Sequence, residues 1–413
     1  MWYYFYMLRK SKKALHSDSE TFTRGVADIV TKSELEKLLD SRTPLRVKHG
    51  IDATSPELHL GHAANLWKLR QLQEAGHKAV ILLGDVTTRI GDPTGKSKTR
   101  PALSKSDIQK NIRAIEKQIK SILLTNPRVC EIRKSSEWYG KMTMADFLDL
   151  LAAVTHARLI ERDMFRERIK KGEQIFMHEL VYPILQGYDS VMLRSDMTVI
   201  GSDQLFNEHM GRFFQERRGL RPQVIVALKI LPGLEGKEKM SKSLGNYIGL
   251  EDTPRDKFGK AMRIPDELIG SYLEVYTDVP MEDMRGIQTK LASGINPRDA
   301  KLVLAEAIVR RYHGTAIAEK EREYFLHVFS KKQISGDIEI LEIRTQSPWK
   351  LARIIREADN SFSQSQIFRL IAQGAITIDG VRKTDRHEMV TLREGSILRI
   401  GPKKLFKIKN PPM

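Results

Sequence analysis

Cysteine is nearly absent from the sequence, because Cys130 is the only one in 413 residues. A single thiol excludes an internal disulfide framework and any zinc site built from cysteines, and it fits a reducing compartment. No apolar run approaches the roughly 18 residues that a membrane-spanning helix needs. The first 13 residues are aromatic and then basic, which is the wrong order for a signal peptide. These absences favour a cytoplasmic protein that contacts no membrane.

Positive charge, by contrast, is in excess. The chain holds 69 Lys and Arg against 52 Asp and Glu, a net charge of +17. Such a surplus indicates a polyanionic partner such as nucleic acid, with a solubilising charge spread over the surface as the alternative. Residues 347–413 hold 13 Lys and Arg against 6 Asp and Glu, so a sixth of the chain carries about two-fifths of the net charge. This concentration favours contact with nucleic acid.

Short apolar runs alternate with longer amphipathic segments between residues 45 and 235. Runs such as 79–83 are typical of strands buried on both faces, whereas 63–75 repeats apolar residues at helical spacing. The predicted strands are 44–51, 79–83, 128–133, 197–200 and 223–231, and the predicted helices are 63–75, 105–124, 144–163, 177–188 and 203–218. Because parallel strands need long crossover connections, this alternation predicts an α/β domain with a doubly wound, Rossmann-like parallel sheet.

Shifts in this pattern predict the domain boundaries. Residues 1–44 are an N-terminal arm with one helix at 32–39, and 45–235 form the α/β domain. A basic loop and a helical domain follow at 236–330, and then a polar linker at 331–346. The last segment, 347–413, begins with helical sequence, turns at Asp379-Gly380 and ends in short alternating runs, which predicts a small α+β domain.

The first candidate site is the turn after the first predicted strand, Gly50-Ile-Asp-Ala-Thr-Ser-Pro-Glu-Leu-His-Leu-Gly-His62. His59 and His62 are three residues apart and share one face at the start of a helix, and Gly61 leaves room for a ligand. Imidazoles beside helix N–H groups can stabilise negative charge that develops on a phosphate. A capping turn with two surface histidines is the plainer alternative.

Two further loops carry cations. Lys237-Glu-Lys-Met-Ser-Lys-Ser-Leu-Gly245 follows the last apolar run, and its lysines suit a leaving polyphosphate, with an ordinary basic loop as the alternative. Gly91-Asp-Pro-Thr-Gly-Lys-Ser-Lys-Thr-Arg100 follows the second strand but lacks the Walker A spacing, which excludes a P-loop NTPase. Lys96 and Arg100 could still meet a phosphate, or they could be solvated charges in a glycine turn.

Together these segments resemble the class I aminoacyl-tRNA synthetases, whose paired signatures match His-Leu-Gly-His at 59–62 and Lys-Met-Ser-Lys-Ser at 239–243. Tyr182-Pro-Ile-Leu-Gln-Gly-Tyr-Asp189 is similar to the pocket helix of the bacterial tyrosyl-tRNA synthetase family, and Gly201-Ser-Asp-Gln204 to its ribose and carboxylate strand end. The resemblance covers residues 32–413. It implies activation of L-tyrosine by ATP, with release of pyrophosphate, and transfer of tyrosine to the 3′ end of tRNA(Tyr).

The resemblance also implies a role for each matching residue. The residues expected to act on the triphosphate in catalysis are Thr54, His59, His62, Lys239 and Lys242. Those expected to bind ATP are Gly50, Asp52, Gly61, Asn65, Lys96, Arg100, Gly201 and Asp203. Those expected to bind tyrosine are Asp92, Tyr182 and Gln186 at its ammonium group, Asp189 at its phenol and Gln204 at its carboxylate end. The reaction needs positioning and cations rather than a protein nucleophile, so no protein-bound metal is expected and Mg²⁺ would arrive with ATP.

The resemblance extends to the C-terminal segment and to assembly. Residues 347–413 are similar to a small RNA-binding domain shared with a ribosomal protein of the small subunit. The candidate phosphate contacts there are Arg369, Arg382, Lys383, Lys403 and Lys404. The family further implies a homodimer, with the helices at about 143–168 as the interface.

The predicted pocket departs from the family pattern at several positions. Lys48 stands where many relatives have a tyrosine that also contacts the phenol. The pair Thr87-Thr88, followed by Arg89, stands where the family usually has Thr-Gly, and Ile200 replaces a common glycine. The nearest alternative is a tryptophanyl-tRNA synthetase, which usually lacks the glutamine found here at 186. A non-catalytic RNA-binding relative would have lost the histidines or the loop lysines. A free-standing adenylating enzyme would not need the RNA-binding domain.

Overall fold

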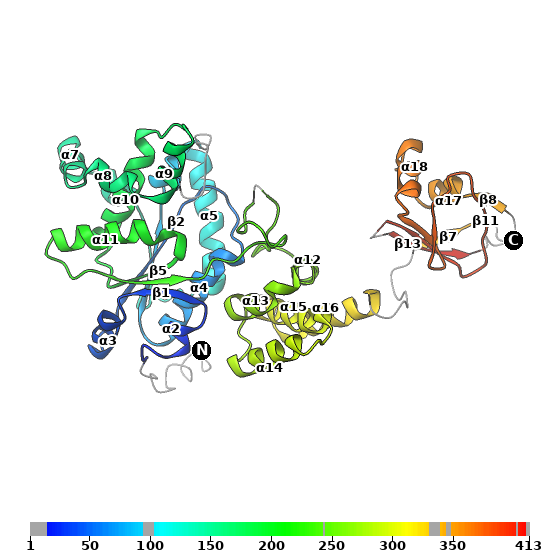
Figure 1. Cartoon of the computed structure of the whole chain (residues 1–413), viewed down its shortest axis with the longest axis horizontal. Coiled ribbons are helices and arrows are strands. Elements are labelled where there is room, and N and C mark those ends of the chain that lie inside the picture. Colours follow the sequence, from blue (N-terminus) through cyan, green and yellow to red (C-terminus); the bar gives the residue numbers. More distant parts are fainter. Residues whose placement is uncertain are drawn as a thin grey trace. The chain divides into compact units, whose positions relative to one another are not determined.

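The chain folds into two units, Met1–Arg322 and Glu323–Met413. A computed structural model describes residues 15–93, 103–242, 244–329, 339–343, 348–401 and 404–409. The first unit contains a parallel sheet covered by helices, followed by a helical part, and the second is a small α+β domain (Figure 1). Within the described ranges, none of the helices has the length and apolar character needed to cross a bilayer.

The six-stranded sheet of the first unit is built from the apolar runs. Its order is β1-β6-β5-β2-β3-β4. The strands are β1 (Val26–Val30), β2 (Arg46–Ile51), β3 (Lys78–Leu83), β4 (Cys130–Lys134), β5 (Met197–Gly201) and β6 (Val224–Leu228). All neighbours from β6 to β4 pair in parallel, and only β1 is antiparallel. Every residue of β6 is buried, as expected for a strand with both faces covered. The doubly wound α/β prediction is confirmed.

Helices α4 (Leu60–Glu74) and α5 (Lys105–Ile122) lie on one side of this sheet, and α10 (Met177–Leu193) and α11 (Leu205–Arg217) lie on the other (Figure 1). Crossovers between parallel strands are right-handed, so the direction in which the chain moves across the sheet decides which face a helix covers. The chain moves from β2 to β4 in one direction and from β5 to β6 in the other, which places the two sets of helices on opposite faces. The carboxyl ends of β2 and β5 therefore lie where the connections turn to opposite faces.

Helices α10 and α11 approach closely because glycines lie at their crossing. A Cβ on Gly187 would stand 2.8 Å from the Cβ of Met210, and a Cβ on Gly211 would stand 2.7 Å from Oγ of Ser190. A close-packed interior cannot absorb such overlaps without moving a helix. The two glycines thus allow polar side chains of the two helices to meet.

The helix predicted over 144–163 is wrong, because the structure divides this segment. It contains α7 (Met144–Ala152), α8 (His156–Ile160) and the start of α9 (Asp163–Lys170). Thr155 begins α8 as an N-cap, with its hydroxyl accepting from the Arg158 N–H at 3.4 Å. A side chain that bonds the backbone at this point favours a new helix start over a continuous helix.

The N-terminal segment contributes more than the predicted helix. Besides α2 (Glu20–Thr23) and α3 (Lys32–Asp40), it contains β1, whose partner is β6, so the sheet begins before residue 45. Only Ile29 among the five residues of β1 is buried. An edge strand of this kind has no continuous apolar run, so the sequence pattern does not predict it.

The remaining described elements are short helices near the sheet and the helical part from residue 254 onward, whose last helix, α16, continues past Arg322. They are η1 (Thr87–Arg89), α6 (Ser136–Tyr139), η2 (Ser202–Gln204), α12 (Pro254–Ala261), η3 (Asp266–Leu268), α13 (Ile269–Tyr276), α14 (Met281–Ala292), α15 (Pro297–His313) and α16 (Thr315–Phe329). The guanidinium of Arg24 donates to four backbone carbonyls at the end of α13, at 2.7–2.9 Å. These bonds satisfy helix-end carbonyls and attach the helical part to the N-terminal segment.

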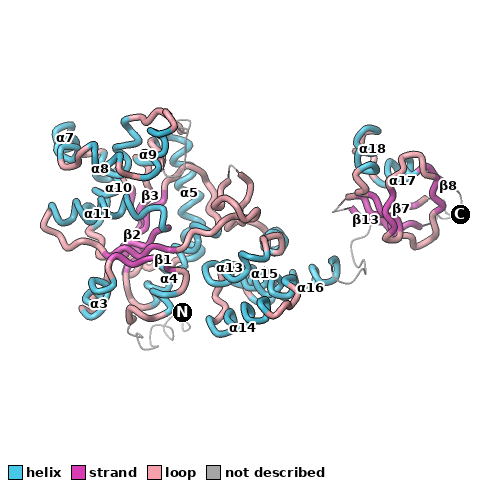
Figure 2. Tube along the Cα trace, viewed as in Figure 1, coloured by secondary structure: helices cyan, strands magenta, loops and turns pink. Residues whose placement is uncertain are grey.

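The second unit packs two helices against short strands (Figure 2). Its elements are β7 (Glu339–Glu342), β8 (Pro348–Lys350), α17 (Leu351–Ala358), α18 (Gln364–Ala372), β9 (Ile376–Ile378), β10 (Val381–Lys383), β11 (Met389–Thr391), β12 (Ile397–Ile400) and β13 (Lys404–Lys409). Asp379 and Gly380 have φ values of 50° and 82° and join β9 to β10, which is the geometry of a tight hairpin turn. Strand β7 pairs with β13, so part of the predicted linker belongs to this sheet.

Candidate active site

A cavity of about 530 Å³ opens at the carboxyl ends of β2 and β5. Open α/β sheets bind ligands where neighbouring strands send their connections to opposite faces, and β2 and β5 form that point here. All the predicted active-site residues within the described ranges line this cavity, namely Gly50, Asp52, Thr54, His59, Gly61, His62, Asn65, Asp92, Tyr182, Gln186, Asp189, Gly201, Asp203, Gln204, Lys239 and Lys242. Lys96 and Arg100 lie outside the described residues.

The two histidines of the first turn are held as neutral hydrogen-bond donors. Nδ1 of His59, the N-cap of α4, accepts from the Gly61 N–H at 3.2 Å, and Nδ1 of His62 accepts from the His59 N–H at 3.2 Å. Because each Nδ1 accepts, the proton of each neutral ring lies on Nε2. Burial, helped by the nearby lysines, lowers the pKa of His59 to about 4 and lowers the pKa of His62 well below its ordinary value. The turn thus offers two N–H donors beside a helix N-terminus, which suits an anion.

The segment after the lysine loop is joined directly to this turn. The Leu60 N–H donates to the Ile248 carbonyl at 3.0 Å, and the Leu250 N–H donates to the Leu58 carbonyl at 2.9 Å. His59 and Gly249 form an isolated antiparallel bridge at the same place. Two stretches nearly 190 residues apart in the sequence are therefore held together by their backbones, independently of the side chains.

The two lysines of the loop reach the cavity in different ways. The backbone of Lys239 bridges to Pro232, and its Nζ lies 2.8 Å from Oδ2 of Asp203. Nζ of Lys242 instead donates to Oγ of Ser55 at 2.5 Å and to the carbonyl of Glu57. Partial burial lowers the pKa of Lys242 to about 8. We call the lysines Lys239 and Lys242, together with the neutral donors His59 and His62, the cationic end of the cavity.

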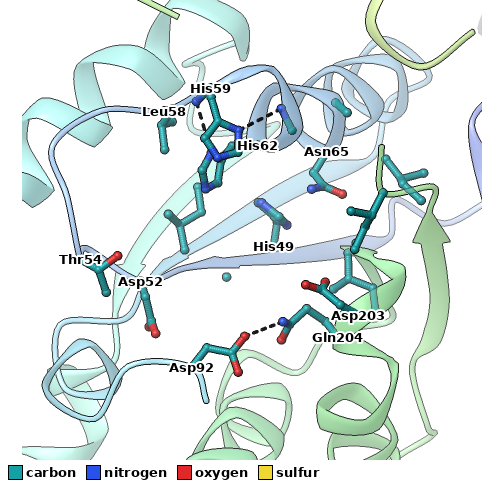
Figure 3. Close-up of a pocket in the computed structure, with 18 of the residues that line it drawn as sticks. His49, Asp52, Thr54, Leu58, His59, His62, Asn65, Asp92, Asp203 and Gln204 are labelled. Carbon is teal, nitrogen blue, oxygen red and sulfur yellow. Dashed lines mark hydrogen bonds between the residues drawn. The ribbon is translucent and has the colours of Figure 1, made fainter. Parts of the chain in front are cut away.

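Carboxylates line the middle of the cavity. The hydroxyl of Tyr182 donates to Oδ2 of Asp52 at 3.0 Å. Nε2 of Gln204 donates to Oδ2 of Asp92 at 2.7 Å (Figure 3). Burial and the nearby carboxylates raise the pKa of Tyr182 well above its ordinary value, so its hydroxyl stays a donor. With Asp203 at the end of β5, three acidic side chains line the same space and would attract a cationic group such as an ammonium.

A chain of amides follows the wall that α10 and α11 form. Nε2 of Gln186 donates to Oε1 of Glu208 at 2.9 Å, and Nδ2 of Asn207 donates to the Oε1 atoms of Gln186 and Gln204, each at 2.9 Å. Ionised carboxylates only accept hydrogen bonds, so Glu208 at one end and Asp92 at the other fix the direction of every amide between them. The wall therefore presents a defined pattern of donors and acceptors.

Beyond this wall the cavity ends in buried charge. Asp189 is 2% exposed, and its Oδ1 accepts from Nε1 of Trp138 at 2.9 Å. Burial raises the pKa of Asp189 to about 7, although the charge of Lys48 and hydrogen bonds from Tyr139 and Trp138 act in the opposite direction. Nζ of Lys48 lies 2.8 Å from Oε2 of Glu208. We call Lys48, Gln186, Asp189 and Glu208 the buried end of the cavity.

Several residues of this site were not predicted from the sequence. His49 lines the cavity between the histidine pair and the Asp92–Gln204 pair, and its Nδ1 donates to the Val199 carbonyl at 2.7 Å (Figure 3). Its place beside Gly50 at the end of a strand was a usable signal. Trp138, Asn207 and Glu208 lie on helices outside the quoted motifs, and only the folded chain brings them to the site.

The predicted RNA contacts belong to the second unit. Arg369 has an exposed side chain on α18. Lys383 pairs with Glu388, Lys404 pairs with Asp359, and Arg382 donates to the carbonyls of Gln373 and Gly374. These three cations therefore also stabilise the domain itself, while Lys403 lies outside the described residues.

The chain is similar to proteins of known activity over most of its length. Residues 40–330 match the family described as tRNA synthetases class I (W and Y). The tyrosine–tRNA ligase of Moorella thermoacetica is 46% identical over 391 residues, covering 93% of this chain and 94% of that protein. The tyrosine–tRNA ligase of Thermotoga maritima is 42% identical over 386 residues, covering 93% and 95%.

Solved structures show the same fold at low identity. The tyrosyl-tRNA synthetase of Archaeoglobus fulgidus, complexed with L-tyrosine, aligns with a TM-score of 0.58 at 23% identity, covering 73% of this chain and 98% of that one. The tryptophanyl-tRNA synthetase of Plasmodium falciparum also aligns with a TM-score of 0.58, at 17% identity, covering 78% and 89%. The fold alone therefore does not separate the tyrosine and tryptophan enzymes.

Taken with the fold and the cavity, these similarities mean that the chain belongs to the class I tRNA synthetases of the tryptophan and tyrosine group. Within that group it is of the bacterial tyrosine–tRNA ligase type, because curated relatives of that name are 39–46% identical to most of its length. The resemblance found in the sequence is confirmed, and the tryptophan alternative is not favoured.

Proposed function

We propose that the chain activates L-tyrosine with ATP, forming tyrosyl-adenylate and pyrophosphate, and then transfers the tyrosine to the 3′ end of tRNA(Tyr). One observation carries this proposal: a single cavity has a cationic end suited to a triphosphate and a buried end suited to a phenol. The first step is an in-line displacement at the α-phosphate by the tyrosine carboxylate. It needs positioning and charge stabilisation rather than a protein nucleophile.

The cationic end would bind the triphosphate. The Nε2–H groups of His59 and His62 would donate to phosphate oxygens, and the lysines would neutralise charge that moves onto the leaving pyrophosphate. Thr54, on the same turn, would assist them. Lys96 and Arg100 would add positive charge from the glycine turn. We further propose that Mg²⁺ arrives bound to the phosphates of ATP, as part of the substrate.

The nucleoside would lie between the cationic end and the carboxyl ends of β2 and β5. Gly50 has no atom within 4 Å of the position that a Cβ would take, so the space above the strand end is open. Oδ1 of Asn65 is buried without a hydrogen-bond partner among the described residues, and a donor on the nucleoside would satisfy it. Asp52, Gly61, Gly201 and Asp203 complete the surroundings of the adenosine.

Tyrosine would extend from the middle of the cavity to the buried end. Its ammonium would bind near Asp92, Tyr182 and Gln186, its carboxylate would point toward Gln204 and the α-phosphate, and its phenol would donate to Asp189. Tyr182, Gln186 and Asp189 are four and three residues apart on α10, so they share one face of that helix. Phenylalanine would leave the buried carboxylate without its hydrogen bond, which disfavours it.

Exchange of labelled pyrophosphate into ATP, measured with each of the twenty amino acids, tests this activity. We expect exchange with tyrosine only. Exchange with tryptophan only, or with none, would overturn the tyrosine assignment. Charging of tRNA(Tyr) by the same preparation tests the second step.

We also propose a homodimer formed by the helices at about 143–168. Large apolar side chains are exposed on α7, including Met144 at 72% and Leu148 at 56%, and Met177 at the start of α10 is 75% exposed. A cluster of this kind on a protein surface is typical of an interface. In sedimentation velocity, Leu148→Glu should shift the protein toward monomer. The control Ile295→Glu also replaces an exposed apolar side chain, but it lies between α14 and α15 and should leave the protein a dimer. A dimer unaffected by Leu148→Glu contradicts this interface.

The second unit would bind tRNA phosphates, with Arg369, Arg382, Lys383, Lys403 and Lys404 as contacts. The net positive charge of residues 347–413 supports this role. Log affinity for tRNA should fall linearly with log salt concentration, and an affinity insensitive to salt would exclude a phosphate-based contact.

A cytoplasmic location stays a prediction of the sequence, supported by the lone cysteine.

A further inference from the structure

Two charges of opposite sign lie at the buried end of the cavity, where both are almost completely shielded from solvent. Lys48 is 1% exposed and Glu208 is 2% exposed, and their Nζ and Oε2 atoms are 2.8 Å apart. Both residues line the cavity. Burying such a pair costs desolvation free energy that apolar side chains would avoid, so stability alone does not account for it.

The contacts of this pair lead to the predicted tyrosine-binding residues. Nζ of Lys48 donates to Oγ of Ser190 at 2.6 Å, and Ser190 directly follows Asp189. Oε1 of Glu208 accepts from Nε2 of Gln186 at 2.9 Å, and Oε2 of Glu208 accepts from Nε2 of Gln223 at 2.7 Å. The glycines at the α10–α11 crossing allow this approach, because any Cβ there would separate the two helices.

We propose that Lys48 and Glu208 act as a positioning pair for tyrosine: Glu208 fixes the amide of Gln186, and Lys48 keeps the Asp189 carboxylate ionised to accept the phenol hydrogen bond. The pair thereby makes the pocket select a hydroxylated ring over an unsubstituted one. This inference rests on the proposed tyrosine activation. It gives a function to Lys48, which stands where related pockets have a second phenol-binding tyrosine.

The electrostatic surroundings of Asp189 support the proposal. The groups that act on its carboxylate are Lys48 on β2, Glu208 on α11, Tyr139 on α6 and Tyr182 on its own helix, and Nε1 of Trp138 on α6 donates to it at 2.9 Å. Burial raises the pKa of Asp189 to about 7, the charge of Lys48 lowers it and the charge of Glu208 raises it. The protonation of Asp189 near neutral pH thus depends on both members of the pair.

Tyrosine affinity measured as a function of pH tests this pair. Tyrosine Kd would be measured by equilibrium dialysis without ATP between pH 5.5 and 8.5, so that Lys242 and the phosphates do not contribute. In the unsubstituted protein, affinity should fall below about pH 7 as Asp189 is protonated. The histidines that line the cavity do not obscure this fall in affinity, which we call the acid limb. Burial lowers the pKa of His49 and His59 to about 4, and it lowers the pKa of His62 well below its ordinary value.

The two single variants should move this limb in opposite directions. Lys48→Met removes the charge that favours ionised Asp189, so its limb should shift upward by about one pH unit, or about tenfold in Kd at a fixed pH below the midpoint. Glu208→Gln removes the opposing charge, so its limb should shift downward. The double variant Lys48→Met/Glu208→Met should lie between the two. Discrimination against phenylalanine should fall in Lys48→Met more than in Glu208→Gln.

A matched control separates these effects on tyrosine affinity from the general loss of stability that follows when a buried lysine is removed. Lys257 is fully buried outside the cavity, with Nζ bonded to the carbonyls of Leu250 and Asp252. Lys257→Met should lower the melting temperature and leave the pH limb in place. Parallel loss of affinity at every pH in Lys48→Met and Glu208→Gln, or unchanged limbs in both, would overturn the proposal. If Lys48→Met does not fold, the direction of the Glu208→Gln shift still decides it.

Discussion

The two ends of the cavity hold their charges in opposite surroundings. At the cationic end the side chain of Lys239 is 49% exposed, whereas at the buried end the side chains of Lys48 and Glu208 are each 2% exposed. Hydrated cations can follow charge as it moves from ATP to pyrophosphate. Desolvated charges are held in one place by their partners and interact strongly with one another. A ligand that leaves one of them without its hydrogen bond therefore binds with a large loss of free energy. The comparison indicates that the rate depends mainly on the cationic end and selectivity mainly on the buried end.

Lys242→Ala should give the largest effect, because it removes a cation from the leaving pyrophosphate. Adenylate formation should slow by about 10²–10³-fold, while tyrosine Kd stays nearly constant. Rapid-quench measurement of the single-turnover rate, together with equilibrium dialysis of tyrosine, checks both parts. A comparable loss of tyrosine affinity would show that the two ends are not separable.

Asp189→Asn should give the next largest effect, at the opposite end. Losing a charge-assisted hydrogen bond should lower kcat/KM for tyrosine by about 10–100-fold, with little change for phenylalanine. The pH dependence below about 7 should also disappear, because residue 189 no longer titrates. An acid limb that persists in this variant would assign the titration to another group.

Comparison of His59→Asn with His59→Ala tests whether the side chain at this position caps α4 and donates a hydrogen bond. Asparagine is a good N-cap and keeps an N–H donor, whereas alanine loses both, so His59→Ala should be slower in exchange by about tenfold relative to His59→Asn. Thermal unfolding of both variants measures the capping part. Equal rates for the two would exclude a donor function for this side chain.

Salt should distinguish the two ends by a smaller effect. The Debye length falls from about 10 Å at 0.1 M salt to about 3 Å at 1 M, so exposed charges are screened and buried ones much less. The KM for ATP should rise about three- to tenfold over this range, while tyrosine Kd changes less than about twofold. A similar salt dependence of both constants would contradict the difference in hydration.

The sequence predicts the central strands well because burial on both faces imposes continuous apolar runs. The predicted 79–83 and 197–200 each differ from β3 and β5 by one residue. The edge strand β1 and the division of residues 144–163 were missed, because an exposed edge has no such run and a single capping threonine ends an otherwise helical pattern. The site residues on motifs were predicted from the sequence. Glu208 was not, since the burial of a helical carboxylate depends on which helix packs against it.

The attachment of the lysine loop makes its two lysines unequal. Lys239 lies at the base of the loop, where a backbone bridge to Pro232 fixes it, while Lys242 reaches the opposite loop through its ammonium group. A phosphate that competes for this ammonium can draw Lys242 away from Ser55 and Glu57 without breaking a bridge of the backbone. Under the proposed function, the backbone of Lys239 would keep its position as the nucleotide arrives, whereas Lys242 would change partners.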